Sequence, residues 1–236
     1  MNIFTVLLYQ PLFNLLILFY EYVPGRDFGV AVILLTVLIR LLLYPLMAES
    51  LRMQKVTAKI QPQMKEIQEK YKDDKEKQAM LIMQLWQENK INPFASILFL
   101  FIQIPILWTL YQVFFDGFKE GSLSLLYGFL PNPGTVNPMF LGVVNLSAAF
   151  PWFAVIAAVL QYLQVKMMMP PKAVETGKER SQSEQFAEMM RWQSIYIMPV
   201  FTALIFWNLP SALGLYWVVS NLFTIGQQYV ILKSNK

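Results

Sequence analysis

The sequence predicts an all-α membrane protein: a core of five transmembrane helices enclosing a hydrophilic groove, a cytoplasmic helical hairpin and an N-terminal interfacial helix. Only 14% of the 236 residues are charged and 56% are hydrophobic, whereas a soluble domain carries roughly a quarter charged residues. The mean hydropathy is +0.43. The uncharged stretches are also long, and a helix needs about 20 apolar residues to cross the hydrocarbon core of a bilayer. We therefore expect lipid to surround most of the chain.

The uncharged stretches give the five spans in order. The first span is expected over 28–47 and contains a single charge, Arg40. The second is expected over 93–116 and the third, which is short, over 151–166. The last uncharged run has twice the required length, and Asn208-Leu209-Pro210 divides it into a fourth span over 192–209 and a fifth over 210–232.

The N-terminal segment, residues 1–27, carries no charge before Glu21. Gln10, Pro11 and Asn14 interrupt its apolar run, which favours a helix lying at the membrane interface over one that crosses. A sixth span and a cleaved signal sequence remain as alternatives. A signal sequence, however, normally has a positive N-terminal region and a small-residue cleavage site, and neither occurs before Glu21.

The distribution of Lys and Arg predicts the orientation. Nine lie in 48–92, five in 166–191 and two in the tail 233–236, whereas the opposite side has only Arg26 and Lys119. Because cytoplasmic loops carry the excess of positive charge, we expect the hairpin 48–92, the loop 167–191 and the C-terminal tail in the cytoplasm. The N-terminus and the loop 117–150 are then extracytoplasmic. The Gly, Ser, Gln and Glu content of 167–190 is typical of a mobile linker.

The first cytoplasmic segment has a helical pattern, with apolar residues spaced by three and four. They are Met53, Val56, Ile60, Met64, Ile67 and Tyr71. A kink or break is expected at Pro62, a turn at 72–74 and a second helix over 75–89. Flexible methionines suit promiscuous apolar contacts, so the candidate client or partner contacts are Met53, Met64, Met80 and Met83. Packing of the two hairpin helices against each other is the alternative. The net charge of +2 over nine basic and seven acidic residues is too small for dedicated nucleic-acid binding.

Arg40 is the strongest single indication of function. An arginine near the bilayer centre costs about 2.5–3.5 kcal/mol on insertion scales and usually faces protein or water, although snorkelling to the interface is an alternative. Polar residues recur in the other spans, and Asn221, Thr224 and Gln228 share one helix face. Together they predict a positively charged polar cavity, although ordinary hydrogen bonds between helices explain some of them. Its candidate residues are Arg40, Gln103, Gln161, Asn221, Thr224 and Gln228.

The composition also limits the chemistry. The chain contains no Cys and no His, which excludes thiol nucleophiles, disulfides, histidine general bases and Cys/His metal sites. We therefore expect no enzyme activity, no metal and no cofactor. A small-solute channel or transporter is the alternative function, but such proteins often contain internal repeats, and the two halves show none.

Short motifs follow one another along nearly the whole chain. They are Gln10-Pro11-Leu12, the segment from Ile39-Arg40 to Tyr44-Pro45-Leu46, Ile60-Gln61-Pro62, Asn92-Pro93, Gln103-Ile104-Pro105-Ile106, Met198-Pro199, Leu209-Pro210-Ser211 with Tyr216-Trp217, and Gln227-Gln228. In this order the sequence resembles the YidC–Oxa–Alb family of membrane protein insertases.

The resemblance implies a chaperone of the bacterial plasma membrane that inserts nascent membrane proteins, alone or with the SecYEG translocon. In this family an arginine at the position of Arg40 lies in a groove that opens to the cytoplasm and to lipid, and attracts hydrophilic client segments. The hairpin is thought to receive clients first. The sequence looks like a short form, without the large extracytoplasmic domain of some members. Only four residues follow Leu232, so ribosome binding is expected to be weak.

Overall fold

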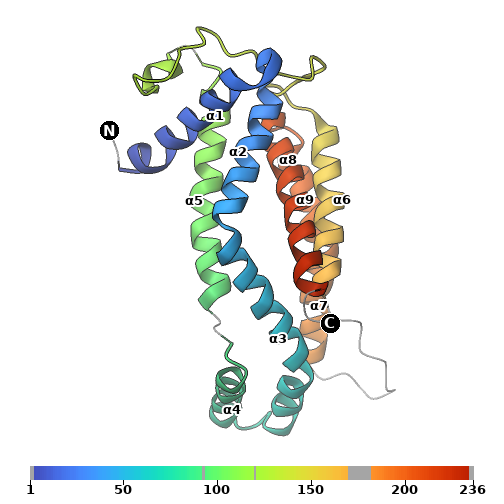
Figure 1. Cartoon of the computed structure of the whole chain (residues 1–236). Helices are drawn as coiled ribbons and strands as arrows, with labels where there is room; N and C mark the ends of the chain where they lie inside the picture. The colour runs from blue at the N-terminus through green and yellow to red at the C-terminus, as the bar shows by residue number, and fades with distance from the viewer. Residues whose placement is uncertain (1–2, 92–93, 120, 170–181, 234–236) are drawn as a thin grey trace.

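The computed structural model describes residues 3–91, 94–119, 121–169 and 182–233. It is mostly helical, which confirms the predicted class. Figure 1 shows helices α2, α5, α6, α8 and α9 standing side by side, with α1 lying across one end and α3 and α4 extending from the other. The N-terminal elements are η1 (Thr5–Tyr9), α1 (Gln10–Tyr22), η2 (Pro24–Arg26), α2 (Phe28–Leu42), α3 (Tyr44–Lys70), α4 (Lys75–Glu88) and α5 (Phe94–Asp116). They are followed by η3 (Ser122–Leu125), β1 (Met139–Phe140), β2 (Val144–Asn145), α6 (Pro151–Met168), α7 (Gln182–Trp192), η4 (Gln193–Ile197), α8 (Met198–Phe206) and α9 (Ser211–Lys233).

The expected first span is divided in the structure. Helix α2 ends at Leu42, and the chain bends by 63° before α3 begins at Tyr44. Pro45 explains the break, because a proline lacks the N–H that would bond to the preceding turn and disfavours helical geometry in the residue before it. The helix expected over 28–47 therefore ends about one turn early.

The hairpin forms largely where the sequence placed it. Helix α3 continues through Pro62 to Lys70, so the break considered at that proline does not occur. A turn follows at 71–74, and α4 begins at Lys75, where the Asp74 carboxylate accepts a hydrogen bond from the Lys77 backbone N–H at 3.0 Å. No residue of α4 is buried, so its side chains contribute little to the core.

The prediction of a mobile linker over 167–190 was wrong for its second part. Residues 182–192 form helix α7, which continues through η4 into α8; residues 170–181 lie outside the described ranges. The apolar residues Phe186, Met189 and Met190 are spaced by three and four, which is typical of a helix. The turn predicted at Asn208-Leu209-Pro210 does occur, between α8 and α9.

A cap closes the end of the bundle beside α1. Asn14 on α1 donates to the Leu125 carbonyl at 3.1 Å and accepts from the Tyr127 backbone N–H at 2.7 Å. The Tyr20 hydroxyl accepts from the Asn137 backbone N–H at 2.9 Å. The two-residue strands β1 and β2, which the all-α prediction did not include, pair antiparallel within this cap. The cap therefore ties α1 to the segment between α5 and α6.

The apolar core lies where α1, α2, α5 and α9 meet. Its most buried members include Phe13, Phe28, Leu35, Leu110 and Tyr216, each no more than 1% exposed. Helix α9 also packs closely against α6 at Gly214. A Cβ at this position would lie only 2.9 Å from the Cβ of Phe153 on α6. These contacts hold α9 at the centre of the bundle.

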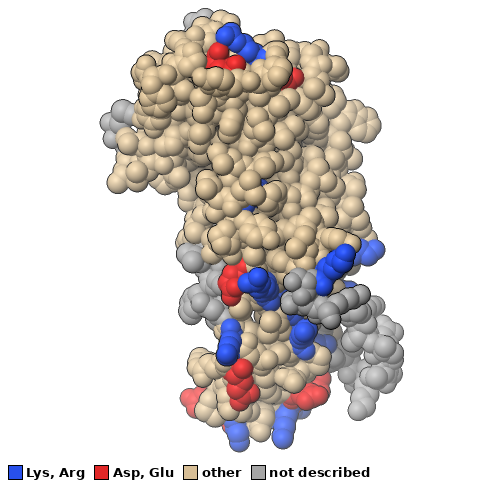
Figure 2. Space-filling view, viewed as in Figure 1, with Lys and Arg blue, Asp and Glu red and all other residues tan. Residues whose placement is uncertain are grey.

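Most charged residues gather at the two ends of the molecule, and Figure 2 shows a broad belt between them in which only a small patch of blue is visible. Among the described residues, α6 alone is by itself long and apolar enough to cross a membrane, and the bent pair α2 and α3 passes the same test together. The break at Leu43 leaves α2 with 15 residues, and α8 has nine. These two helices are each shorter than the length that a straight span needs.

Candidate functional site: a buried arginine and a methionine-lined cavity

Arg40 lies in the last turn of α2 and is only 7% exposed. Its Nη1 donates to the Met47 sulfur at 3.4 Å, and its Nε is buried without an acceptor. A guanidinium has five N–H donors, and a thioether is a weak acceptor. Within the described ranges, no carboxylate lies within ion-pair distance of Arg40. The burial of Arg40 argues against snorkelling, and its charge is not neutralised by a described residue.

Helix α9 carries polar side chains that bond to three neighbouring helices. The Tyr216 hydroxyl accepts from Gln103 Nε2 on α5 at 3.1 Å, and Gln227 Nε2 donates to the Tyr44 carbonyl at the start of α3 at 3.2 Å. Toward α6, the Asn221 side chain donates to the Ala157 carbonyl at 3.0 Å, and Trp217 Nε1 donates to Gln161 Oε1 at 3.3 Å. Thr224 donates to its own helix, at the Ser220 carbonyl. Three predicted site residues, Gln103, Gln161 and Asn221, thus also join helices.

Several buried polar atoms nevertheless have no partner among the described residues. On α2, α5 and α9 they are Arg40 Nε, Gln103 Oε1, Ser220 Oγ, Gln227 Oε1 and Gln228 Oε1. Leaving one buried donor or acceptor unpaired costs roughly 1–3 kcal/mol, and the cost is higher in hydrocarbon, where no water can replace the missing partner. Five such atoms on three packed helices favour an interior that binds polar groups from outside the chain.

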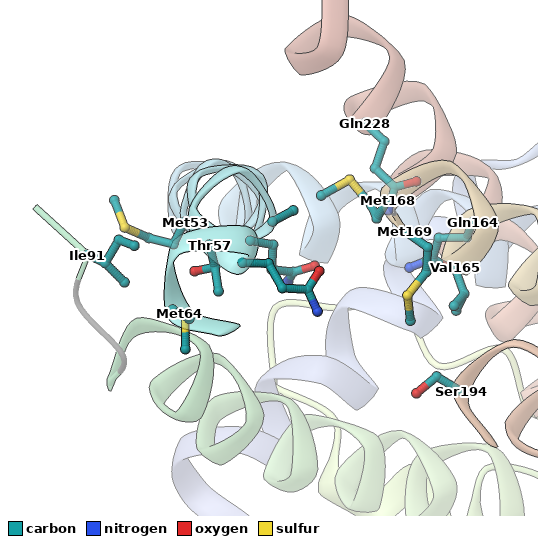
Figure 3. A pocket seen from close by; sticks show the side chains of 13 residues that line it. Met53, Thr57, Met64, Ile91, Gln164, Val165, Met168, Met169, Ser194 and Gln228 are labelled. Atoms are coloured by element: carbon teal, nitrogen blue, oxygen red, sulfur yellow. The ribbon is translucent and has the colours of Figure 1, made fainter. Parts of the chain in front are cut away.

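A cavity of about 580 Å³ lies between α3 on one side and α6, η4 and α9 on the other. Figure 3 shows Met53, Thr57 and Met64 on one side and Met168, Met169 and Gln228 on the other, with the Met53 side chain directed toward Ile91. The full lining is Met53, Gln54, Thr57, Ala58, Gln61, Met64, Ile91, Gln164, Val165, Met168, Met169, Ser194 and Gln228. None of these residues is charged, and the four thioethers make much of the wall soft and polarisable. The cavity thus suits uncharged, largely apolar groups.

The structure brings only part of the predicted site together. Of the six predicted polar residues, Gln228 lines the cavity, whereas Arg40 is not among the lining residues. Of the four predicted methionines, Met53 and Met64 line the cavity, but Met80 and Met83 are 60% and 57% exposed on α4. The candidate site therefore has two parts: the buried Arg40, and the methionine-lined cavity.

The sequence reasoning missed the polar part of the α3 wall. Gln54, Thr57 and Gln61 are spaced by three and four, so they share one helix face with each other. The polar residues of 48–92 thus carry a helical periodicity of their own, which indicates this face. The contributions of Gln164 and Ser194 depend on how α6 and η4 pack against α3, which no local pattern encodes.

Several known bacterial proteins are similar to this chain. A protein of Syntrophus aciditrophicus is 35% identical over 226 residues, which is 95% of this chain and 36% of that protein. One of Geobacter metallireducens is 32% identical over 97% of this chain and 37% of its own length. One of Listeria monocytogenes is 36% identical over 88% of this chain and 64% of its own length. The first two are named membrane protein insertase YidC and the third membrane protein insertase YidC 1.

This chain spans little more than a third of the length of the first two relatives. A family profile described as 60Kd inner membrane protein matches residues 18–236, which include all of α2 to α9 and both parts of the candidate site. The chain therefore belongs to the 60Kd inner membrane protein family.

Proposed function

We propose that this chain is a membrane protein insertase and chaperone, which inserts nascent membrane proteins into the bilayer and helps them fold. The names of its relatives support this proposal. The observation that carries it is the buried Arg40, whose charge none of the residues in the described ranges neutralises. A permanent positive charge inside an apolar belt is costly, and it is useful where a hydrophilic segment has to be drawn into the membrane.

Arg40 is proposed to attract the hydrophilic, often acidic, segment that leads a client across the membrane. A carboxylate entering hydrocarbon loses its hydration, and a guanidinium with unused donors compensates part of that loss. A hydrogen bond to a charged group contributes about 1.5–3 kcal/mol. The unpaired atoms on α2, α5 and α9 add further hydrogen-bonding capacity. These contacts would lower the free-energy barrier for moving a hydrophilic segment into the membrane. They need no covalent chemistry and no nucleotide, so the proposed activity is not enzymatic.

The methionine-lined cavity is proposed to hold the apolar part of the same client. Its walls come from the hairpin helix α3 and from α6 and α9, so a client contacting the hairpin would already lie beside the bundle. Methionine side chains adapt to differently shaped apolar groups. This property suits a protein that has to accept many clients.

The proposed topology places five spans, α2, α5, α6, α8 (with η4) and α9, around this groove in the bacterial plasma membrane. The N-terminus and the cap between α5 and α6 are extracytoplasmic, and the hairpin and the C-terminus are cytoplasmic. The excess of Lys and Arg at the hairpin end supports this orientation. The SecYEG translocon and, more weakly, the ribosome are proposed partners.

Reconstitution tests the proposed function. The purified chain in liposomes is expected to protect a newly synthesised single-span client from added protease, above the level in protein-free liposomes. Parallel liposomes loaded with a small fluorescent solute measure leakage. Client protection without leakage supports an insertase. Leakage without client protection contradicts the proposal and favours a small-solute channel.

A further inference from the structure

A second cavity, of about 310 Å³, lies between η1 and α5. It is lined by Phe4, Thr5, Tyr9, Trp108 and Gln112, none of which belongs to the site described above. Its volume is at the lower end of ordinary ligand pockets, which measure roughly 300–1,000 Å³. Its α5 residues, Trp108 and Gln112, belong to the second half of that helix, and Figure 1 shows this half beside α1 and away from the hairpin.

The polar side chains of this cavity have hydrogen-bonding capacity that no described residue uses, and each of them can donate as well as accept. Thr5 and Tyr9 each offer a hydroxyl and Gln112 an amide, and within the described part of the chain none of these side chains has a hydrogen-bond partner. Burial, and then the negative charge of Asp116, raise the pKa of Tyr9 to about 12. The Tyr9 hydroxyl therefore keeps its proton at physiological pH. Three such donors favour a ligand rich in acceptor oxygens.

The cavity opens beside an aromatic face of α5. Trp108, which is 58% exposed, stacks on Tyr111 at 5.9 Å between ring centroids, and Tyr111 stacks on Phe115 at 5.7 Å. The Lys119 ammonium lies 4.2 Å from the Phe115 ring centroid. The spacing of three and four places these rings on one side of the helix. Exposed Trp and Tyr are typical of the membrane interface, so this side of α5 suits contact with lipid.

An opposite-charge pair ends the aromatic face. Lys119 Nζ lies 2.7 Å from Asp116 Oδ1, and both side chains are exposed, at 55% and 39%. Asp116 is one helical turn beyond Gln112, or about 6 Å along the axis. The Lys119–Asp116 ion pair thus lies about one helical turn from the three polar side chains of the cavity. This arrangement matches a ligand that carries one positive and one negative charge beside a group of ester oxygens.

We propose that this cavity binds one phospholipid with a zwitterionic amine headgroup of the phosphatidylethanolamine type. Its ester oxygens accept from Thr5, Tyr9 and Gln112, and its acyl chains run along Trp108. Its phosphate faces Lys119 and its ammonium faces Asp116. The bound lipid would fix η1 against α5. The site is separate from Arg40 and the methionine-lined cavity, so this inference does not depend on insertase activity.

The test uses lipids with brominated acyl chains, which quench nearby tryptophan fluorescence. In a full-length variant Trp108 is kept, and Trp86, Trp152, Trp192, Trp207 and Trp217 are replaced by Phe. Brominated phosphatidylethanolamine in a phosphatidylglycerol bilayer is compared with the reverse mixture at equal mole fraction. The expected preference for the ethanolamine lipid is about tenfold, the ratio that 1.4 kcal/mol supplies.

Matched variants separate the parts of the proposed site. Gln112→Leu is expected to weaken quenching, and Asp116→Asn to abolish the preference between headgroups. Lys166→Gln is the control, because Lys166 makes the same kind of contact with an aromatic ring, that of Tyr162, but within α6 and not at this cavity. A second measurement is needed if the single-tryptophan variant does not fold. Native mass spectrometry of the chain with all its tryptophans then counts the ethanolamine lipid that is retained with and without Gln112→Leu. Equal quenching by both lipids, or retention unchanged by Gln112→Leu, overturns the proposal.

Discussion

Arg40 and Met47 contact each other across the break between α2 and α3, where Arg40 Nη1 donates to the Met47 sulfur at 3.4 Å. The buried charge of α2 is thereby connected to the first turns of the hairpin helix. The same break is held from the opposite direction by Gln227 on α9, which bonds to the Tyr44 carbonyl at 3.2 Å. The break in the first predicted span is thus a bend that contacts from both α2 and α9 support.

Replacing Gln227 should loosen this bend. Gln227→Leu removes the donor to the Tyr44 carbonyl together with the unpaired Gln227 Oε1. It is expected to destabilise the protein by about 0.5–1.5 kcal/mol, the net contribution of one hydrogen bond. Thermal unfolding in detergent measures the change. Gln84→Leu is the matched control, because Gln84 bonds to Glu88 on the exposed surface of α4. Equal melting temperatures for the two variants would show that the Gln227 contact does not support the bend.

Gly29 should tolerate no side chain. A Cβ there would overlap the Phe140 ring and lie 2.7 Å from Phe140 Cβ, between the start of α2 and strand β1. Gly29→Ala is expected to lower stability by about 1–3 kcal/mol through overpacking, and Phe140→Ala in the same chain should recover part of the loss. Thermal unfolding again provides the measurement.

Gly226→Ala is the control for Gly29. Gly226 lies in α9, and a Cβ there would meet nothing within 4 Å. Alanine favours a helix by up to about 1 kcal/mol over glycine, so this variant should be neutral or stabilising. If Gly29→Ala were as stable as Gly226→Ala, the packing of the cap against α2 would be described wrongly.

The methionines of the hairpin should differ in how strongly they contact a client. A photo-crosslinking residue in place of Met53 or Met64, both lining the cavity, is expected to capture a ribosome-bound client stalled during insertion. The same residue in place of Met80 or Met83, exposed on α4, should capture it several-fold less. Crosslinking measured on gels compares the four positions. Stronger capture at Met80 and Met83 would move client contact from the cavity to the outer arm of the hairpin.

Much of the fold could be predicted from the sequence, because lipid imposes long apolar helices and Pro and Gly mark many of their ends. The turn before α4 and the turn at Asn208-Leu209-Pro210 occur where local residues placed them. The break at Leu43 was missed because an unbroken apolar run hides the effect of Pro45. The continuation of α3 through Pro62 was equally hidden, since a proline inside a helix is tolerated when the surrounding structure supports it.

The sequence could single out candidate site residues but not how they assemble, and their roles stay predictions. Arg40 was conspicuous as the one charge inside an expected span rather than at its end, and the structure buries it. Asn221 and Gln228, which the sequence places on one helix face, have different environments. Asn221 bonds to α6, and Gln228 lines the cavity. The bend before α3 decides which hairpin residues face α6, and that geometry is a property of tertiary packing.

The buried polar atoms predict a groove that water reaches. The chain contains no Cys, so a single Gln103→Cys or Gln228→Cys substitution can be labelled without background. Both should react with a membrane-impermeant thiol reagent added to the cytoplasmic side. Leu213→Cys is the buried control and should stay unlabelled, because Leu213 lies in the apolar core and, unlike Gln228, does not line the cavity. Labelling at neither glutamine position, with full labelling at an exposed residue of α4, would contradict a hydrated interior.

The most direct test of the account is the rate at which Arg40 variants insert a client with an acidic leading segment. In reconstituted liposomes, Arg40→Ala should slow protease protection of this client by about tenfold or more, the loss expected for one charged hydrogen bond. Arg40→Lys should preserve most of the rate, and a client with a neutral leading segment should be slowed less. Arg52→Ala, at an exposed arginine paired with Glu49, is the control. Insertion of the acidic client by Arg40→Ala at the unchanged rate would contradict the proposed role of the buried charge.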